Sequence, residues 1–144
     1  MDIIYKETCG GLDQQNLVEL WHSVGWYEGS ALDPARLLAS MRNSGRVVTA
    51  WDGKRLVGLC SSITDSLNVW ISYMVVHAGY QGTGIGTELL RRNISCYGDC
   101  RLYVQTVNAS GFYQASGFVE TMVSLKRDGF LPSIGKMKQK GSRR

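Results

Sequence analysis

The chain has 144 residues, of which 44% are hydrophobic and 19% are charged. This length allows a single domain with a buried core, and the composition is that of a globular protein and not of a disordered or fibrous one. No apolar run is long enough to cross a membrane as a helix, so no membrane partner is expected. The N-terminal residues lack a basic stretch followed by an apolar run, which argues against a signal peptide.

The formal net charge is +4, and much of the positive charge lies close to the C-terminus. Basic residues gather after Pro132 in a stretch with little apolar content: Lys136, Lys138, Lys140, Arg143 and Arg144. Such a pattern is typical of a solvated tail. Because no aromatic residues alternate with these charges and no binding motif accompanies them, no dedicated nucleic-acid function is expected. The sequence therefore predicts one domain over residues 1–130 and a basic tail over residues 131–144.

The four cysteines are Cys9, Cys60, Cys96 and Cys100. They contain no CxxC pair and no pair of histidines lies near them, so neither a zinc site nor a disulfide framework is predicted, and no metal is expected. Reduced thiols fit a cytoplasmic protein, because disulfides are rare in that compartment.

The first predicted elements are a short strand over residues 3–7 and two helices. Asp13 is a capping residue for the first helix, which should end near Gly25. Asp33 and Pro34 begin the second helix, because proline is favoured at the first helical position, and residues 43–45 end it. Apolar residues recur at helical spacing in both helices: Leu17, Leu20, Trp21 and Val24, then Leu37, Leu38 and Met41.

Three strands are predicted next. The runs 46–51 and 56–62 are rich in strand-forming residues, and Asp52-Gly53 between them favours a tight type I′ hairpin turn. The run 69–76 is apolar on both alternating faces, which predicts a central strand covered on both sides.

The last predicted elements are a helix over residues 84–97, a strand over 102–107, a short helix over 110–116 and a final strand over 119–125. The element order is therefore β-α-α-β-β-β-α-β-α-β. Early strands that pair as hairpins and later strands joined through helices predict an α/β (α+β) fold. Its single sheet should be mixed and mostly antiparallel, with helices on both faces.

Three alternate glycines, Gly82, Gly84 and Gly86, lie between the central strand and the long helix. Glycine permits positive φ and close approach of the backbone, so successive N–H groups can converge on one anion. The N-terminus of the following helix adds further N–H groups, which makes a phosphate the expected ligand. A dinucleotide fingerprint would need glycine at Thr87, and a P-loop would need Gly-Lys-Ser/Thr; neither is present. A turn that only reverses the chain remains an alternative.

The loop Gln81-Gly82-Thr83-Gly84-Ile85-Gly86 resembles the Gln/Arg-x-x-Gly-x-Gly/Ala signature of the GNAT N-acetyltransferases. The predicted element order over residues 3–125 is similar to that of the family. Residues 108–118, Asn-Ala-Ser-Gly-Phe-Tyr-Gln-Ala-Ser-Gly-Phe, look like its second signature, shortened by a residue or two. Residues 23–26, 56–58 and 80–82 look most like the small bacterial and plastid-type amine acetyltransferases. The resemblance implies direct transfer of an acetyl group from acetyl-CoA to a primary amine, with no covalent enzyme intermediate.

The resemblance also implies where acetyl-CoA binds. Pantetheine should lie along the central strand, where a β-bulge would open the slot for the acetyl group and a backbone N–H at Met74 or Val75 would stabilise the oxyanion. The expected cofactor-binding residues are Met74, Val75, Val76, Gln81, Gly82, Thr83, Gly84, Ile85, Gly86, Thr87, Asn108, Phe112 and Tyr113.

Tyr113 matches the family position of the general acid that serves the departing thiolate. A phenol of pKa about 10 protonates a thiol of pKa about 8.5 only with help from its position, so Tyr113 would act mainly by hydrogen bonding. It would otherwise be a half-buried aromatic on a short helix. The base that deprotonates the amine has four candidates: Glu28, Asp65, His77 and Tyr73. Tyr73, on the central strand, is the catalytic candidate, although a packed core tyrosine fits equally well, and a structural role is favoured for His77.

Trp26, Tyr27 and Glu28 follow the first helix, in the segment that shapes the acceptor pocket in similar enzymes. Their aromatic faces favour an aryl or alkyl amine, although packing against the sheet explains them as well. Two alternative functions keep the fold: a non-catalytic acyl-CoA-binding regulatory module, and a protein N-acetyltransferase whose basic tail recruits acidic partners. A homodimer is common among similar proteins and is a further expectation.

Overall fold

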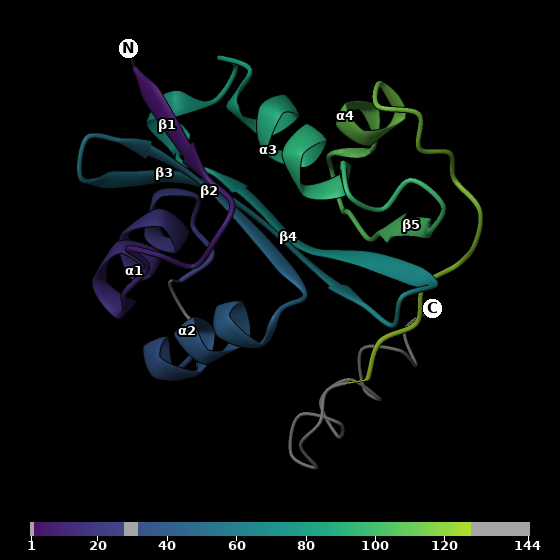
Figure 1. Cartoon of the computed structure of the whole chain (residues 1–144), viewed down its shortest axis with the longest axis horizontal. Helices are drawn as coiled ribbons and strands as arrows, with labels where there is room; N and C mark the ends of the chain where they lie inside the picture. Colours follow the sequence, from purple (N-terminus) through teal and green to yellow (C-terminus); the bar gives the residue numbers. More distant parts are fainter. Residues whose placement is uncertain (1, 28–31, 128–144) are drawn as a thin grey trace, which may run out of the picture. The chain divides into compact units, whose positions relative to one another are not determined.

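A computed structural model describes residues 2–27 and 32–127 of the chain (Figure 1). The chain divides into two compact units, Met1–Val104 and Gln105–Arg144, and each is described by itself. Glu28 and the predicted tail over residues 131–144 lie outside the described residues. The prediction of one domain over residues 1–130 stays a prediction.

The described part of the first unit contains a five-stranded sheet in the order β1-β2-β3-β4-β5. All neighbouring strands are antiparallel except β4 and β5, which are parallel, so the predicted mixed, mostly antiparallel sheet is confirmed. The elements are β1 (Ile3–Lys6), α1 (Gln14–Ser23), α2 (Pro34–Asn43), β2 (Arg46–Asp52), β3 (Arg55–Thr64), β4 (Asn68–Val76), the 3₁₀ turn η1 (Ala78–Tyr80), α3 (Ile85–Ile94) and β5 (Arg101–Val104).

Both predicted helix starts in the N-terminal half are confirmed. The Asp13 side chain accepts a hydrogen bond from the Asn16 N–H at 2.8 Å, and the Asn16 side chain accepts one from the Asp13 N–H at 3.0 Å. This reciprocal capping box satisfies two N–H groups that the helix itself leaves unpaired. Asp33 accepts from the Ala35 N–H at 3.0 Å, with Pro34 as the first residue of α2.

The turn between β2 and β3 differs from the predicted one. Asp52 pairs with Arg55, so the two turn residues are Gly53 and Lys54 and not Asp52 and Gly53. Gly53 has φ +59°, whereas Lys54 does not have positive φ. Positive φ at the first turn position alone is the property of a type II′ turn, so the predicted type I′ turn is wrong. The reason is that Asp52 pairs with Arg55 as the last residue of β2, so the turn begins one residue later than the sequence suggested.

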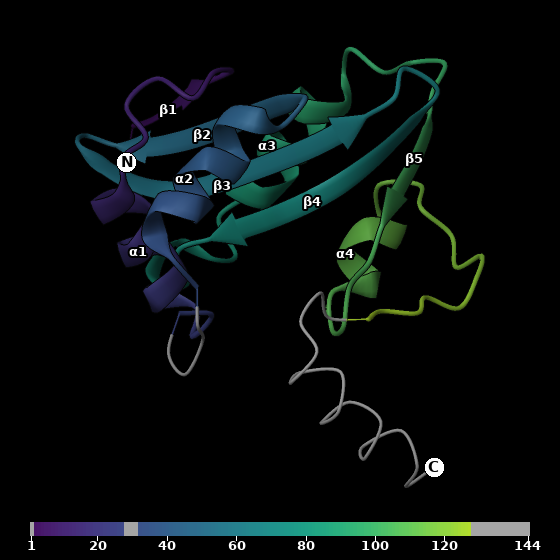
Figure 2. The ribbon, with the colours of Figure 1, turned by 90° about the horizontal axis from the view of Figure 1, so that it is seen from below.

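Helices cover both faces of the sheet (Figures 1 and 2). On one face α1 and α2 bury a cluster that includes Leu17, Leu20, Trp21, Leu37, Met41, Leu59 and Val75. On the other face α3 packs over Gly58, where an added Cβ would lie 2.8 Å from Leu89 Cδ1 and 3.1 Å from Ile85 Cγ2. The missing side chain at Gly58 therefore allows α3 to lie close against β3.

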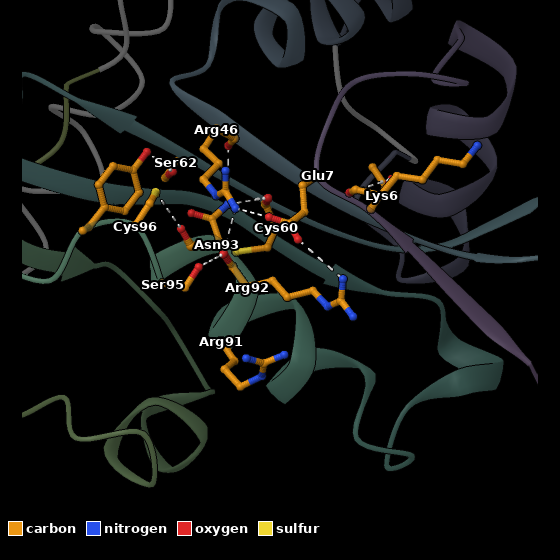
Figure 3. Close-up of polar contacts among 12 residues, drawn as sticks. Lys6, Glu7, Arg46, Cys60, Ser62, Arg91, Arg92, Asn93, Ser95 and Cys96 are labelled. Carbon is orange, nitrogen blue, oxygen red and sulfur yellow. Dashed lines mark hydrogen bonds and ion pairs between the residues drawn. The ribbon is translucent and has the colours of Figure 1, made fainter.

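Polar contacts fasten the C-terminal half of α3 to the sheet (Figure 3). The Asn93 side chain is fully buried, and its amide donates to the Cys60 carbonyl at 2.8 Å. The Arg46 guanidinium donates to the Glu7 carboxylate and, at 3.2 Å, to the Arg92 carbonyl. These contacts tie α3 to β2, to β3 and to the residue after β1, and so fix the helix whose N-terminus follows the glycine loop.

The second unit contains the short helix α4 (Ser110–Gln114). The predicted final strand over residues 119–125 is wrong, because the structure assigns neither helix nor strand there. Its apolar side chains are 69–91% exposed at Val119, Met122, Val123 and Leu125. Strand formation requires a pairing partner, and no ladder in the described residues includes this segment. A strand-forming composition was therefore not sufficient to make residues 119–125 a strand.

Candidate functional site

The parallel strands β4 and β5 separate halfway along β4. Their pairing runs from Asn68 opposite Arg101 to Ile71 opposite Val104, where it ends, while β4 continues to Val76. On its other side β4 pairs with β3 through Ser62 opposite Ile71 and then Ser61 opposite Tyr73. Ser72 is thus the extra residue of a β-bulge, which bends the strand. In Figure 2 β5 turns away from β4, and the pairing of the two strands ends at Ile71, so β5 does not cover the edge of β4 beyond this residue.

The backbone of β4 beyond the bulge presents one open edge. The His77 N–H donates to the Val57 carbonyl at 2.8 Å. This bond shows which residues of β4 direct their backbone groups to β3. Since only alternate residues direct their backbone groups to the same neighbour, Tyr73 and Val75 point to β3, whereas Met74 and Val76 point away from it. The Val75 side chain is also buried. Met74 and Val76 are therefore the residues whose backbone groups face the open side.

The glycine loop follows η1, the short turn after the end of β4. The Gln81 side-chain amide donates to the Val76 carbonyl at 3.0 Å. Gly82 and Gly84 have φ +77° and +89°, and an added Cβ would have nothing within 4 Å at either position. Positive φ, and not lack of space, is therefore what requires glycine at these two positions.

The loop leads into a helix N-terminus that no side chain caps. Gly84 is the N-cap of α3 and makes no side-chain cap hydrogen bond. The Glu88 N–H is the first to bond within the helix, to the Gly84 carbonyl at 3.1 Å. The N–H groups of Ile85, Gly86 and Thr87 precede it and have no intrahelical partner. They offer an anion a set of donors at the positive end of the helix dipole.

Glu88 is the acidic residue of that first helical turn, and its charge would oppose a bound phosphate. Its carboxylate accepts from Arg91 Nε at 2.7 Å and from Arg92 Nε at 2.9 Å. The Arg91 hydrogen bonds first, and then that of Arg92, lower the pKa of Glu88 to about 2. The two guanidinium groups thus compensate the negative charge of Glu88.

Tyr73 is linked to the surface through a row of aromatic rings in the first unit. Its half-buried ring contacts the Trp21 ring edge-on, with centroids 5.3 Å apart, and Trp21 contacts Trp26 in the same way at 6.0 Å. Trp26 is 48% exposed. Tyr27 is partly buried against the core beneath α1 and α2. The structure thus connects the expected acceptor segment to β4 next to Met74.

The end of α1 explains the position of Trp26. Gly25 has φ +77°, its N–H donates to the His22 carbonyl at 3.0 Å, and the Trp26 N–H donates to the Trp21 carbonyl at 3.0 Å. This is the Schellman pattern, in which the residue after the glycine packs on the residue that accepts its hydrogen bond. The local sequence at the helix end therefore places the Trp26 ring on Trp21.

Two of the four base candidates have local structural roles. Asp65 accepts from the Leu67 N–H at 2.9 Å and the Asn68 N–H at 2.7 Å, and hydrogen bonding from Asn68 lowers the pKa of Asp65. Asp65 belongs to the turn before β4. Because a strand rises by about 3.3 Å per residue, this turn lies about 20 Å from Met74 along β4. His77 accepts the Gly79 N–H on Nδ1 at 3.0 Å and so orders η1. Tyr73 is the remaining candidate within the described residues.

Tyr113 is held in the second unit by the same kind of helix end. Gly117 has φ +94°, its N–H donates to the Gln114 carbonyl at 3.0 Å, and the Phe118 N–H donates to the Tyr113 carbonyl at 3.1 Å. The Tyr113 ring contacts those of Phe112 and Phe118, at centroid distances of 5.0 and 5.6 Å. The Gly-Phe that ends the second signature therefore fixes Tyr113 on α4. The roles of Asn108, Phe112 and Tyr113 stay predictions.

Two contacts at the site have no motif that would predict them. The Tyr80 hydroxyl donates to Asp52 Oδ2 at 2.5 Å, and the Ser61 and Ser72 hydroxyls lie 2.8 Å apart. Each pair joins residues from different strands or loops, so only the tertiary structure brings them together. Asp52 raises the pKa of Tyr80, chiefly because its carboxylate accepts the hydroxyl proton in a hydrogen bond.

The described part of the chain contains neither a cluster of metal ligands nor a helix that could cross a membrane. Among residues 2–27 and 32–127 no three His, Cys, Asp or Glu side chains gather so that they could hold a metal ion. None of the helices in these ranges has both the length and the apolar character needed to cross a membrane. The four cysteines are free thiols, and burial raises the pKa of the Cys60 thiol to about 12.

The sequence matches the family model of the acetyltransferase (GNAT) domain over residues 43–120. Because this match covers more than half of the chain, the protein belongs to the GNAT acetyltransferase family. The matched range includes β4, the glycine loop, α3 and α4. No protein of curated function matches the sequence.

Solved structures share the fold. The GNAT family acetyltransferase SP0256 of Streptococcus pneumoniae TIGR4 is 22% identical, with a TM-score of 0.70 over 88% of this chain and 100% of that one. Protein SA2161 of meticillin-resistant Staphylococcus aureus is 18% identical, with a TM-score of 0.76 over 88% and 99%. The aminoglycoside acetyltransferase HMB0005 from an uncultured soil metagenomic sample is 15% identical, with a TM-score of 0.64 over 89% and 99%. At such identities the likeness shows the fold and no more.

Proposed function

We propose that the protein transfers an acetyl group from acetyl-CoA directly to a primary amine. The observation that carries this proposal is the open edge of β4 at Met74 and Val76, followed at once by the glycine loop and the uncapped N-terminus of α3. An extended amide chain that ends in a pyrophosphate needs these two features in this order. Membership of the GNAT acetyltransferase family supports the same activity.

Acetyl-CoA would bind as an additional strand along the edge of β4 that β5 leaves unpaired. The amides of pantetheine would pair with the backbone of Met74 and Val76, and the pyrophosphate would accept from N–H groups of the loop and the first helical turn. The residues proposed for the pyrophosphate are Gln81, Gly82, Thr83, Gly84, Ile85, Gly86 and Thr87. No basic side chain is required, because backbone donors and the helix dipole supply the positive field.

In the proposed reaction the amine nitrogen attacks the thioester carbonyl carbon and the carbon–sulfur bond breaks. The amine loses one proton and the thiolate gains one, so no covalent bond to the enzyme is needed. The carbonyl oxygen becomes an oxyanion and needs a fixed donor. We assign this role to the Met74 N–H, because the Val75 N–H belongs to the ladder with β3.

Two tyrosines are proposed for the proton transfers. Tyr113, with Phe112 and Asn108 beside it in the sequence, would hydrogen-bond the leaving sulfur and return its proton. Tyr73 would accept the amine proton, directly or through a water molecule. Its position one residue before Met74 supports this role, whereas its contact with Trp21 also fits a purely structural tyrosine.

The acceptor is proposed to be a small aryl or alkyl amine. The exposed ring of Trp26, next to Tyr27, offers an aromatic face for a cation or an aryl group, and Glu28 follows in the sequence. The structural neighbour HMB0005 is described as an aminoglycoside acetyltransferase, which also acts on a small molecule. Free cysteine thiols support a cytoplasmic location, and a homodimer stays a prediction.

The test measures thiol release from acetyl-CoA with a panel of aryl, alkyl and polyamine acceptors, together with the dissociation constant for CoA. Amine-dependent release supports the proposed enzyme. Tight CoA binding with no release across the panel would instead favour a non-catalytic acyl-CoA-binding module. Absence of CoA binding would contradict both functions.

A protein acceptor is tested with a chain truncated after Gly129. If the truncated protein acetylates small amines as well as the full chain does and labels no protein, the basic tail has no role in the transfer. Labelling of acidic proteins by the full chain alone would favour the protein acetyltransferase.

A further inference from the structure

Tyr80 is the point at which three segments meet around the glycine loop. Its hydroxyl donates to Asp52 Oδ2 at 2.5 Å, at the end of β2. Its N–H donates to the His77 carbonyl at 2.8 Å, and its own carbonyl accepts from Thr83 Oγ1 at 2.6 Å. One residue thus connects the sheet, the end of β4 and the middle of the loop.

Beyond its first residue, where the Gln81 side chain donates to the Val76 carbonyl at 3.0 Å, the loop is open to solvent. Residues 81–84 are all exposed, and nothing lies within 4 Å of a Cβ position at Gly82 or Gly84. Glycine has the greatest backbone freedom of all residues, so a loop with two glycines at positive φ is ordered only at a large entropic cost. Converging N–H groups bind an anion well only if that order exists before the ligand arrives.

Asp52 is a rigid anchor for this contact. It is paired on both sides within the sheet, with Ile3 of β1 and with Arg55 of β3. The contact with Tyr80 spans 28 residues, so it connects the loop to a part of the fold that does not depend on the loop. A hydrogen bond to a carboxylate is stronger than one between neutral groups.

We propose that Tyr80 and Asp52 form a tether that holds the glycine loop in the conformation that receives the pyrophosphate of CoA. Tyr80 is then a positioning residue, which acts through the backbone N–H groups of the loop and does not itself touch the phosphates. This inference rests on the proposed function, because it takes CoA as the ligand of the loop.

The test measures dissociation constants for CoA, 3′-dephospho-CoA and pantetheine. The first two carry the pyrophosphate, and pantetheine does not. Tyr80→Phe should weaken both pyrophosphate ligands by about fivefold, since a charge-assisted bond that is partly open to water contributes less than a buried one. Binding of pantetheine should not change.

Asp52 variants supply the second half of the test. Asp52→Ala should weaken CoA binding as Tyr80→Phe does, and Asp52→Asn should restore most of the affinity because the amide oxygen still accepts the hydroxyl proton. The double variant Tyr80→Phe/Asp52→Ala should bind CoA no more weakly than the weaker single variant. Tyr97→Phe removes a hydroxyl that lies 3.4 Å from Ser62 Oγ, beyond the far end of α3, and should leave all three constants unchanged.

Three results would overturn the tether: equal CoA binding by Tyr80→Phe and the wild type, equal weakening of pantetheine, or additive losses in the double variant. These results leave the proposed function intact as long as the wild type binds CoA. Failure of the wild type to bind any of the three ligands would overturn the proposed function, and the tether with it.

Discussion

The hydroxyl groups of Ser61 and Ser72 lie 2.8 Å apart at the point where β4 and β5 separate. Ser61 is fully buried on β3, whereas Ser72 is the exposed extra residue of the bulge. The pair therefore connects the bulge to the rigid centre of the sheet. This asymmetry in burial decides how the two serines respond to substitution.

Ser72→Ala should destabilise the protein more than Ser61→Ala. The first change leaves the buried Ser61 hydroxyl without its partner, at a cost of about 1–3 kcal/mol, whereas the second leaves the Ser72 hydroxyl free to bond water. The free energy of unfolding from urea titrations measures both. The double variant should be more stable than Ser72→Ala alone, and the reverse order of the single variants would contradict this account.

Gly84→Ala should weaken CoA binding at least about tenfold and destabilise the chain by about 1 kcal/mol, because alanine is strained at φ +89°. Calorimetric titration with CoA and urea unfolding measure the two effects. Gly98→Ala is the matched control: its φ is not positive and an added Cβ meets nothing within 4 Å. Similar CoA affinities in the two variants would argue against the loop as the phosphate site.

Gly58→Val should destabilise the protein by about 1–3 kcal/mol through overpacking. An added Cβ already lies 2.8 Å from Leu89 Cδ1, so α3 must move away from the sheet. Because the N-terminus of α3 moves with it, CoA should also bind less tightly. Thermal unfolding and CoA titration test the variant, and wild-type behaviour in both would show that α3 does not depend on the small residue at this position.

The carboxylate of Glu88 should contribute to stability only above acidic pH. Hydrogen bonds from Arg91 and Arg92 lower its pKa in the folded state from 4.5 to about 2, so the folded protein favours the charged form. The contribution is fully present above pH 4.5 and is lost as pH falls towards 2. Glu88→Gln should therefore be less stable than the wild type at pH 6, and the gap should close over that window.

Urea titrations of both proteins at each pH follow this gap. Glu19→Gln, which changes an exposed carboxylate on α1, is the control and should follow the wild type throughout. A gap of constant size between pH 6 and pH 2 would show that the charge of Glu88 is not responsible.

Tyr113→Phe should lower turnover by about tenfold or more and should weaken acetyl-CoA binding by much less, because general acids act in the transition state. Phenylalanine keeps the ring contacts with Phe112 and Phe118. Turnover is measured with an amine found in the thiol-release panel. Tyr103→Phe, whose ring stacks on Trp70, is the control. Unchanged turnover of Tyr113→Phe at saturation would remove Tyr113 from the mechanism.

Local sequence was sufficient for features that depend on neighbouring residues. Asp13 and Asp33 predicted two helix starts correctly, because a cap and its N–H partner lie within three residues of each other. The glycine loop was predicted for the same reason, since positive φ at Gly82 and Gly84 is a property of single residues. Recognition of the family rested on this loop and on the segment around Tyr113.

Pairing between distant segments decided the features that the local sequence did not predict correctly. The hairpin turn moved by one residue, and the segment 119–125 formed no strand, because strand register and partners are not local properties. The choice between Met74 and Val75 as the proposed oxyanion donor likewise depended on which residues of β4 bond to β3.

The sequence by itself thus determined the glycine loop, the helix caps and the family, because each is encoded in a few consecutive residues. Only the tertiary structure decided where β4 opens and what holds the loop, through Ser61 with Ser72 and Asp52 with Tyr80. The physical reason is that a hydrogen bond between residues far apart in the chain exists only after the sheet has brought them together.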